Sequence, residues 1–207
     1  MNSLLNQFQS CTLLTFPENE RETKDLLSRQ DLSAYISVRK FISNCSSANA
    51  IERILFSPVF PLIVEGLSCD YEIQFEALWI ITNLCSGSSF FSEYMVKNYN
   101  LLHKLDFECS GKVFVQQAWV IGNLSIDSDE YVEFFVQRGY IQKILHALRQ
   151  NLDEDTLGWV LGNVLRLESS RVYFSSLHLT HLQGLSLDFV DNRKEEDLAS
   201  QIKVMRI

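Results

Sequence analysis

The sequence has few of the residues that interrupt regular structure. Its 207 residues include only 3 Pro and 8 Gly. A sandwich of short β-strands needs turn residues roughly every 8–12 positions, so this scarcity disfavours an all-β fold. The 5 cysteines are odd in number and never form a CxxC spacing. That excludes the common zinc and thiol-redox motifs and favours a reducing, intracellular environment.

Several motifs of catalysis and ligand binding are also absent. The sequence contains no GxGxxG, GxxxxGK, GxSxG or HExxH, which are signatures of nucleotide binding, serine hydrolysis and zinc proteolysis. The 4 histidines have no matching pattern of cysteines or carboxylates, so no metal site is expected. No window approaches the roughly 18 uninterrupted apolar residues of a membrane span. We therefore expect no enzyme, no cofactor and no membrane partner.

Apolar residues and a concentrated negative charge are what the sequence does contain. The hydrophobic fraction is 46%, enough for a packed core. The net charge is −8, and fourteen acidic against six basic residues within 65–155 account for all of it. Such a field repels nucleic acid and attracts cationic partners. A solvated acidic surface without any partner is the alternative.

All three tryptophans lie 40 residues apart, and each is followed four residues later by asparagine. The apolar residues around these pairs repeat as well. The three segments are FEALWIITNL (75–84), VQQAWVIGNL (115–124) and DTLGWVLGNV (155–164). A period this regular indicates a duplicated structural unit.

Each of these segments predicts a long helix, because its apolar residues follow helical spacing without an interior proline. Tryptophan and asparagine at i and i+4 then share one face of the helix. Two shorter amphipathic stretches precede each long helix. In one copy they are 131–138 and 140–150, separated by Gly139, and in an earlier copy 50–56 and 59–67. The repeat unit is therefore predicted to contain three helices.

About four such units fit the chain. Forty residues before Trp79 stands Arg39, in a helix-like segment (34–43) that lacks the tryptophan–asparagine pair. Residues 169–190 again have the pattern of the first two helices of a unit. Atypical units at both ends are typical of repeat proteins, whose terminal repeats must present a polar outer face.

A period near 40 with three helices per unit is the armadillo pattern, and the sequence resembles importin alpha, the adaptor family of nuclear import. The segments that carry the resemblance are FEALWIITNLCSG (75–87), QQAWVIGNLSIDSDEY (116–131) and FFVQRGYIQKIL (134–145). The resemblance implies an all-α, right-handed superhelical armadillo solenoid of about four repeats. We expect a capping segment at 1–31, armadillo repeats at 32–190 and a charged capping helix at 191–207.

The tryptophan and asparagine rows suggest a ligand by their chemistry. Long helices stacked in parallel would line a concave groove. Indole faces can accept the stems of lysine and arginine, with cation–π attraction of about 0.5–2 kcal/mol per site. Asparagine amides can both donate to and accept from an extended backbone. In an acidic field the expected ligand is a lysine-rich peptide, and a purely core role for the tryptophans is the alternative.

The resemblance implies the same function, namely binding of basic nuclear localisation signals of cargo proteins by an adaptor found in cytoplasm and nucleus. It implies slots at the tryptophans, backbone clamps at the asparagines, an acid that receives a lysine ammonium at Asp127, and further contacts beside them. The implied peptide-binding residues are Trp79, Asn83, Gly87, Ser92, Gln116, Trp119, Asn123, Asp127, Trp159, Asn163 and Arg166.

One expected feature of the family is missing from the N-terminal segment. The basic arm that recruits importin beta in this family has no counterpart in 1–31, which holds three basic and five acidic residues. The sequence therefore gives no support for importin beta as a partner. A second hypothesis stays open beside the adaptor: an armadillo scaffold subunit of a larger complex that binds no signal peptide.

Overall fold

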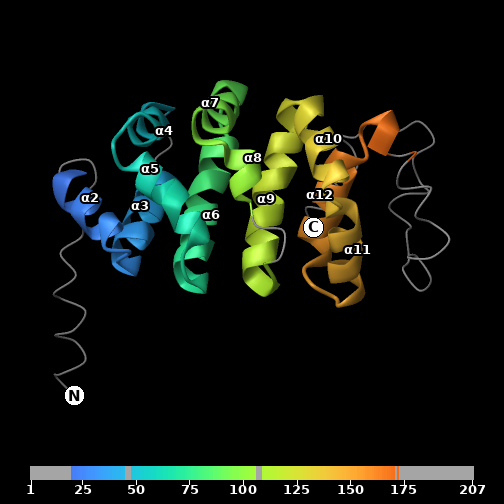
Figure 1. The fold of residues 1–207 in the computed structure, drawn as a ribbon, viewed down its shortest axis with the longest axis horizontal. Coiled ribbons are helices and arrows are strands. Elements are labelled where there is room, and N and C mark those ends of the chain that lie inside the picture. The colour runs from blue at the N-terminus through green and yellow to red at the C-terminus, as the bar shows by residue number, and fades with distance from the viewer. Residues whose placement is uncertain (1–19, 45–47, 106–108, 171, 173–207) are drawn as a thin grey trace, which may run out of the picture. The chain divides into compact units, whose positions relative to one another are not determined.

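A computed structural model of the chain describes residues 20–44, 48–105, 109–170 and 172. Within these residues the regular structure is entirely helical (Figure 1). The chain divides into two compact units, Met1–Asp106 and Phe107–Ile207. None of the described helices combines the length and apolar character that crossing a bilayer requires.

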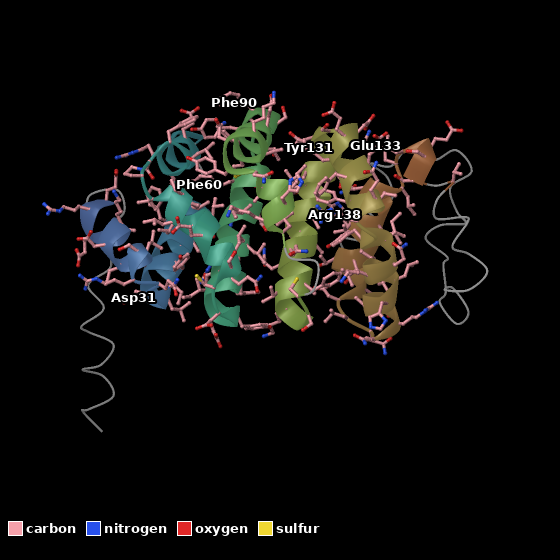
Figure 2. The ribbon with its side chains drawn as sticks, viewed as in Figure 1. Asp31, Phe60, Phe90, Tyr131, Glu133 and Arg138 are labelled. Atoms are coloured by element: carbon pink, nitrogen blue, oxygen red, sulfur yellow. The ribbon has the colours of Figure 1, made fainter. Side chains whose placement is uncertain are left out.

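The first unit contains two long helices that pack along each other, α3 and α6, with shorter helices around them (Figure 1). Its elements are α2 (Glu20–Ser28), α3 (Leu32–Asn44), α4 (Ala48–Leu55), α5 (Phe60–Glu65), η1 (Gly66–Ser68), α6 (Tyr71–Cys85), α7 (Ser89–Tyr99) and α8 (Leu101–Lys104). Phe60, labelled in Figure 2, is fully buried and packs edge-on against Tyr99, with ring centroids 4.8 Å apart. This contact packs α5 against the end of α7.

The second unit repeats this arrangement, with its long helices α9 and α12 packed against each other. Its elements are α9 (Gly111–Asp127), α10 (Asp129–Gln137), α11 (Tyr140–Arg149) and α12 (Glu154–Val164). Both α10 and α11 contact a long helix of the unit, α10 on α9 and α11 on α12. The core includes Phe135 and Tyr140, both fully buried.

Short signals in the sequence separate these helices. Gly139 adopts a left-handed backbone with φ of 77° between α10 and α11, a conformation that glycine takes at no steric cost. Asn100, with φ of 53°, stands at the corresponding place between α7 and α8. Ser88 and Ser128 cap the helices that follow them by accepting a backbone N–H two residues later.

The predicted three-helix unit is confirmed. Helices α10, α11 and α12 cover the predicted segments 131–138, 140–150 and 155–164, and α4, α5 and α6 form the same succession in the first unit. The predicted boundaries at 31 and 190 stay predictions. The segment 191–207 and most of 169–190 lie outside the described residues.

Candidate functional site

One side of α9 is open to solvent, although most of this helix is buried. Its exposed side chains include Lys112, Trp119 and Ile126, which recur every seven residues and therefore lie nearly above one another. Trp119 is 38% exposed and Ile126 is 55% exposed. Half-buried polar side chains flank this line. Together they form a surface that we call the α9 stripe: Lys112, Gln116, Trp119, Asn123, Ile126 and Asp127.

The stripe brings together four of the predicted site residues on a single helix. Gln116, Trp119, Asn123 and Asp127 follow one another at intervals of three and four residues, which places them on adjacent turns of one face. An exposed indole beside exposed aliphatic surface is what a binding surface offers and a core does not.

Asp127 is the last residue of α9. The C-terminal end of a helix carries partial negative charge, so a carboxylate there is electrostatically unfavourable. Its Oδ2 atom is buried and has no hydrogen-bond partner among the described residues. A cation brought to this carboxylate would relieve the repulsion.

Trp159 of α12 lies directly against Trp119. The two ring centroids are 4.8 Å apart and the ring planes are inclined by 38°. An aliphatic stem between two rings would need about twice the usual carbon contact distance of ~3.5–4.0 Å. No aliphatic stem therefore fits between these two indoles, and Trp159 packs against the Trp119 ring.

Glycine makes this close approach possible. A Cβ atom on Gly122 would stand 2.3 Å from Cζ3 of Trp159, so no larger residue fits without moving the ring. Asn163, one turn after Trp159, is only 2% exposed, and its Nδ2 donates a hydrogen bond to the Gly122 carbonyl oxygen over 3.2 Å. In this structure the amide of Asn163, predicted to clamp a peptide backbone, joins α12 to α9.

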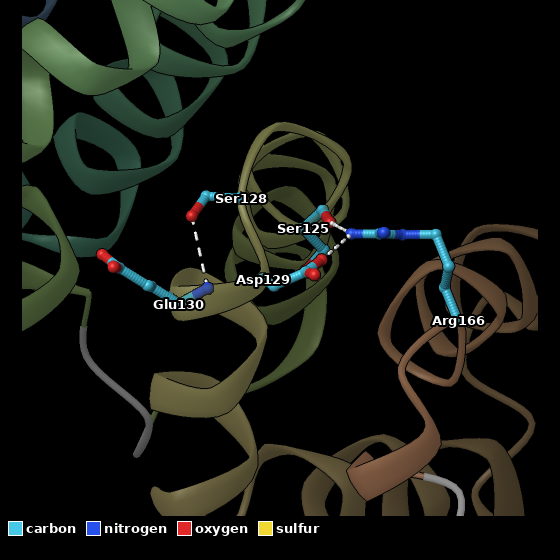
Figure 3. A network of polar contacts seen from close by, with 5 residues as sticks. All are labelled: Ser125, Ser128, Asp129, Glu130 and Arg166. Carbon is cyan, nitrogen blue, oxygen red and sulfur yellow. Dashed lines mark hydrogen bonds and ion pairs between the residues drawn. The ribbon is translucent and has the colours of Figure 1, made fainter.

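Arg166 has a similar internal role. Its Nη2 donates to the carbonyl oxygen of Ser125 at 2.9 Å and pairs with Oδ1 of Asp129 at 2.8 Å (Figure 3). The guanidinium thus satisfies a carbonyl near the end of α9, where a positive charge is favourable. Arg166 was predicted to contact peptide, whereas the structure shows it fastening the end of α12 to the α9–α10 junction.

In the first unit, the chain's own arginine covers the predicted slot residue Trp79. The Cζ atom of Arg39, on α3, lies 4.2 Å from the centroid of the Trp79 ring. Nε of Arg39 also donates to Oε2 of Glu76 in an ion pair, one turn before Trp79 on α6. Sequence reasoning missed this role of Arg39. The available signal was the period itself, because Arg39 stands 40 residues before Trp79.

The remaining predicted residues of the first unit differ in how far they are exposed. Asn83 is half-buried and its Nδ2 donates to the carbonyl oxygen of Trp79 at 2.9 Å, within the same helix. Gly87 is exposed. Ser92 is fully buried on α7, and its hydroxyl has no hydrogen-bond partner among the described residues. The Ser92 hydroxyl, predicted to contact the peptide, thus lies inside the unit in this structure.

The described residues give no indication of a metal centre. A search of them finds no group of three or more His, Cys, Asp or Glu side chains able to hold an ion. Among the described residues, the cysteines Cys69, Cys85 and Cys109 form no disulfide bond.

Comparison with known sequences identifies relatives of one kind. No family model matches the chain. It is 29% identical to importin subunit alpha-2 of Arabidopsis thaliana over 142 residues, which are 65% of this chain and 26% of that protein. It is 29% identical to importin subunit alpha-1b of Oryza sativa subsp. japonica over 146 residues, 67% of this chain and 27% of that protein. The chain thus spans about a quarter of the length of these relatives.

Solved structures that resemble this one include designed armadillo proteins. A computationally designed armadillo repeat protein for modular peptide recognition superposes with a TM-score of 0.65 at 13% identity, covering 88% of this chain and 79% of the design. A designed armadillo repeat protein in complex with the peptide (KR)4 gives a TM-score of 0.56 at 15% identity, covering 93% and 95%. The protein is therefore an all-α armadillo-repeat protein, and its predicted resemblance to importin alpha is confirmed.

Proposed function

We propose that the protein is a peptide-binding adaptor that holds extended lysine-rich segments of other proteins on the α9 stripe. The observation that carries this proposal is the exposed indole of Trp119, with Asn123 and the Asp127 carboxylate on the next two turns of the same helix. By analogy with the importin alpha relatives, the ligands would be nuclear localisation signals. The setting would be nuclear protein import, in cytoplasm and nucleus.

Each side chain of the stripe has a distinct role in this proposal. The exposed part of Trp119 attracts a lysine or arginine by a cation–π contact of about 0.5–2 kcal/mol. Asn123 hydrogen-bonds the peptide backbone, and Gln116 adds a polar contact one turn earlier. Asp127 receives an ammonium group. Lys112 lies at the opposite end of the stripe from Asp127, so peptide cations are favoured toward the Asp127 end.

The other predicted residues of this unit position α9 and the Trp119 ring through contacts from α12 and the residues that follow it. Trp159 backs the Trp119 ring, while Asn163 and Arg166 hold α12 against α9. The acidic segment 65–155 adds long-range attraction for basic peptides. The (KR)4 complex of a designed armadillo protein supports the choice of ligand, since that protein holds a basic peptide on the same fold.

Fluorescence anisotropy of a labelled lysine-rich peptide tests the proposal directly. We expect Trp119→Ala to weaken binding roughly 2- to 30-fold, which corresponds to the cation–π range. Asn123→Ala should weaken binding by a similar factor. Asp127→Asn should weaken it and flatten its salt dependence.

The matched controls lie on α10 of the same unit. Glu133→Gln removes an exposed carboxylate (labelled in Figure 2) and Gln137→Ala shortens an exposed amide, and neither should change the dissociation constant by more than about 2-fold, because both lie outside the stripe. No binding by wild-type protein that is helical by circular dichroism would refute the adaptor. The hypothesis of a scaffold subunit in a larger complex would then be favoured.

A further inference from the structure

We propose that the guanidinium of Arg39 occupies the face of the Trp79 ring. Arg39 is then a specificity-determining residue, because it keeps this tryptophan from binding a cation of the ligand. The inference rests on the proposed function, because it concerns which tryptophans of the chain bind basic side chains. It changes the predicted site: the pair Trp79/Asn83 repeats the pattern of Trp119/Asn123, yet it would stay closed to lysine-rich peptides while Arg39 is present.

The geometry places Arg39 where a ligand cation would lie. Its guanidinium carbon is 4.2 Å from the Trp79 ring centroid, well within the roughly 6 Å of an effective cation–π contact. Phe75 meets the same indole edge-on, with centroids 5.6 Å apart. Trp79 is half-buried, so little of its ring is left for another cation.

Glu76 holds the arginine in this position. It forms an ion pair with Arg39 Nε, and the two side chains are only 11% and 17% exposed. Glu76 and Trp79 are three residues apart on α6, so both face the same part of α3. An ion pair with this little exposure is screened far less by salt than a surface pair.

A ligand must therefore compete with a tethered cation. A group attached to a packed neighbouring helix acts at an effective concentration on the order of millimolar or higher. A lysine of a peptide would have to displace Arg39 from both the indole and the carboxylate. Without Arg39, the same place would offer an indole face beside an acidic side chain, which is the chemistry that binds lysine or arginine.

Fluorine NMR on full-length protein labelled with 5-fluorotryptophan tests this residue by residue. The chain has 3 tryptophans, so three resonances are expected, assigned through Trp79→Phe, Trp119→Phe and Trp159→Phe. Tetralysine peptide is the probe. We expect it to leave the Trp79 resonance of wild type unmoved at concentrations that shift Trp119. In Arg39→Ala it should shift Trp79, with an apparent affinity for that tryptophan at least about 5-fold tighter than in wild type.

Three further variants make the result specific. Arg39→Lys keeps a cation and should leave Trp79 closed. Lys40→Ala removes an exposed positive charge next to it on α3 and should behave as wild type, which controls for net charge. Arg39→Gln keeps most of the stem without the charge, so it carries the same test if Arg39→Ala does not fold.

Two results would overturn the proposal. One is a Trp79 resonance that responds to tetralysine equally in wild type and in Arg39→Ala. The other is a Trp79 resonance that stays silent in folded Arg39→Ala and Arg39→Gln. The proposed function is tested separately in the same spectra: it fails if tetralysine does not shift the Trp119 resonance of wild type.

Discussion

Trp79 in the first unit and Trp159 in the second carry the same sequence pattern but have different neighbours. Arg39 covers Trp79, and the ring of Trp119 packs on Trp159. In both cases the contacting residue stands 40 positions earlier in the chain. A residue of the preceding repeat therefore makes a different contact with each of these two tryptophans.

The two asparagines that follow these tryptophans differ in the same way. Asn83 is half-buried and donates to a carbonyl of its own helix. Asn163 is buried and donates to Gly122 on the neighbouring helix. The position 41 residues before Asn163 is Gly122, whereas the one 41 residues before Asn83 is Ile42. A glycine admits a close helix contact that a branched side chain prevents.

The largest expected difference between the units is in the stability effect of removing each asparagine. Asn163→Ala should lower the free energy of unfolding by about 2–3 kcal/mol, because it removes a buried hydrogen bond between two helices and opens space in the core. Asn83→Ala should change it by less than about 0.5 kcal/mol, because only a local hydrogen bond is lost. Urea unfolding followed by circular dichroism measures both. Equal losses would show that the two asparagines are equivalent after all.

Gly122→Ala tests the close approach itself. The added methyl would stand 2.3 Å from the Trp159 ring, so the ring must move, and overpacking of this kind costs about 1–3 kcal/mol. The near-ultraviolet circular dichroism of the Trp119–Trp159 pair should change with it. Lys112→Ala, an exposed substitution on the same helix, is the control and should stay within about 0.5 kcal/mol of wild type. Unchanged stability and spectrum for Gly122→Ala would mean that the rings do not touch in solution.

Arg166→Gln should have a smaller effect than Asn163→Ala or Gly122→Ala, a loss of about 0.5–1 kcal/mol. The side chain of Arg166 is 37% exposed and that of Asp129 is 60% exposed, so solvent screens the pair. Most of the loss should come from the hydrogen bond to the Ser125 carbonyl. Unfolding curves at low and high salt separate the two parts, since only the ion pair weakens with salt. A loss of unfolding free energy above about 2 kcal/mol would contradict the view that one hydrogen bond and a solvent-screened ion pair are all that Arg166 contributes.

Much of the fold followed from local signals. Helical spacing of apolar residues predicted the long helices, and Gly139 marked the break between α10 and α11. These features depend on neighbours within a few residues, so the same local pattern occurs again in each repeat. The resemblance then indicated the armadillo fold.

The details of the site were less predictable because periodicity does not determine how closely two helices approach. It placed Trp119, Asn123 and Asp127 on one face, as the structure has them. It could not show that Asn163 is buried, since that depends on a single glycine on another helix. Nor could it show that Ser92 is buried, because serine is common both on surfaces and at packed contacts.

The contact of Gly122 with Trp159 also limits how repeats of this chain can be exchanged in protein engineering. Three residues after each tryptophan stand Thr82, Gly122 and Gly162. A module built on α6 and placed directly before α12 would put the threonine side chain into the space of the Trp159 ring. These repeats are consequently not interchangeable blocks: a module placed directly before α12 must supply a glycine at this position, because the Trp159 ring lies against it.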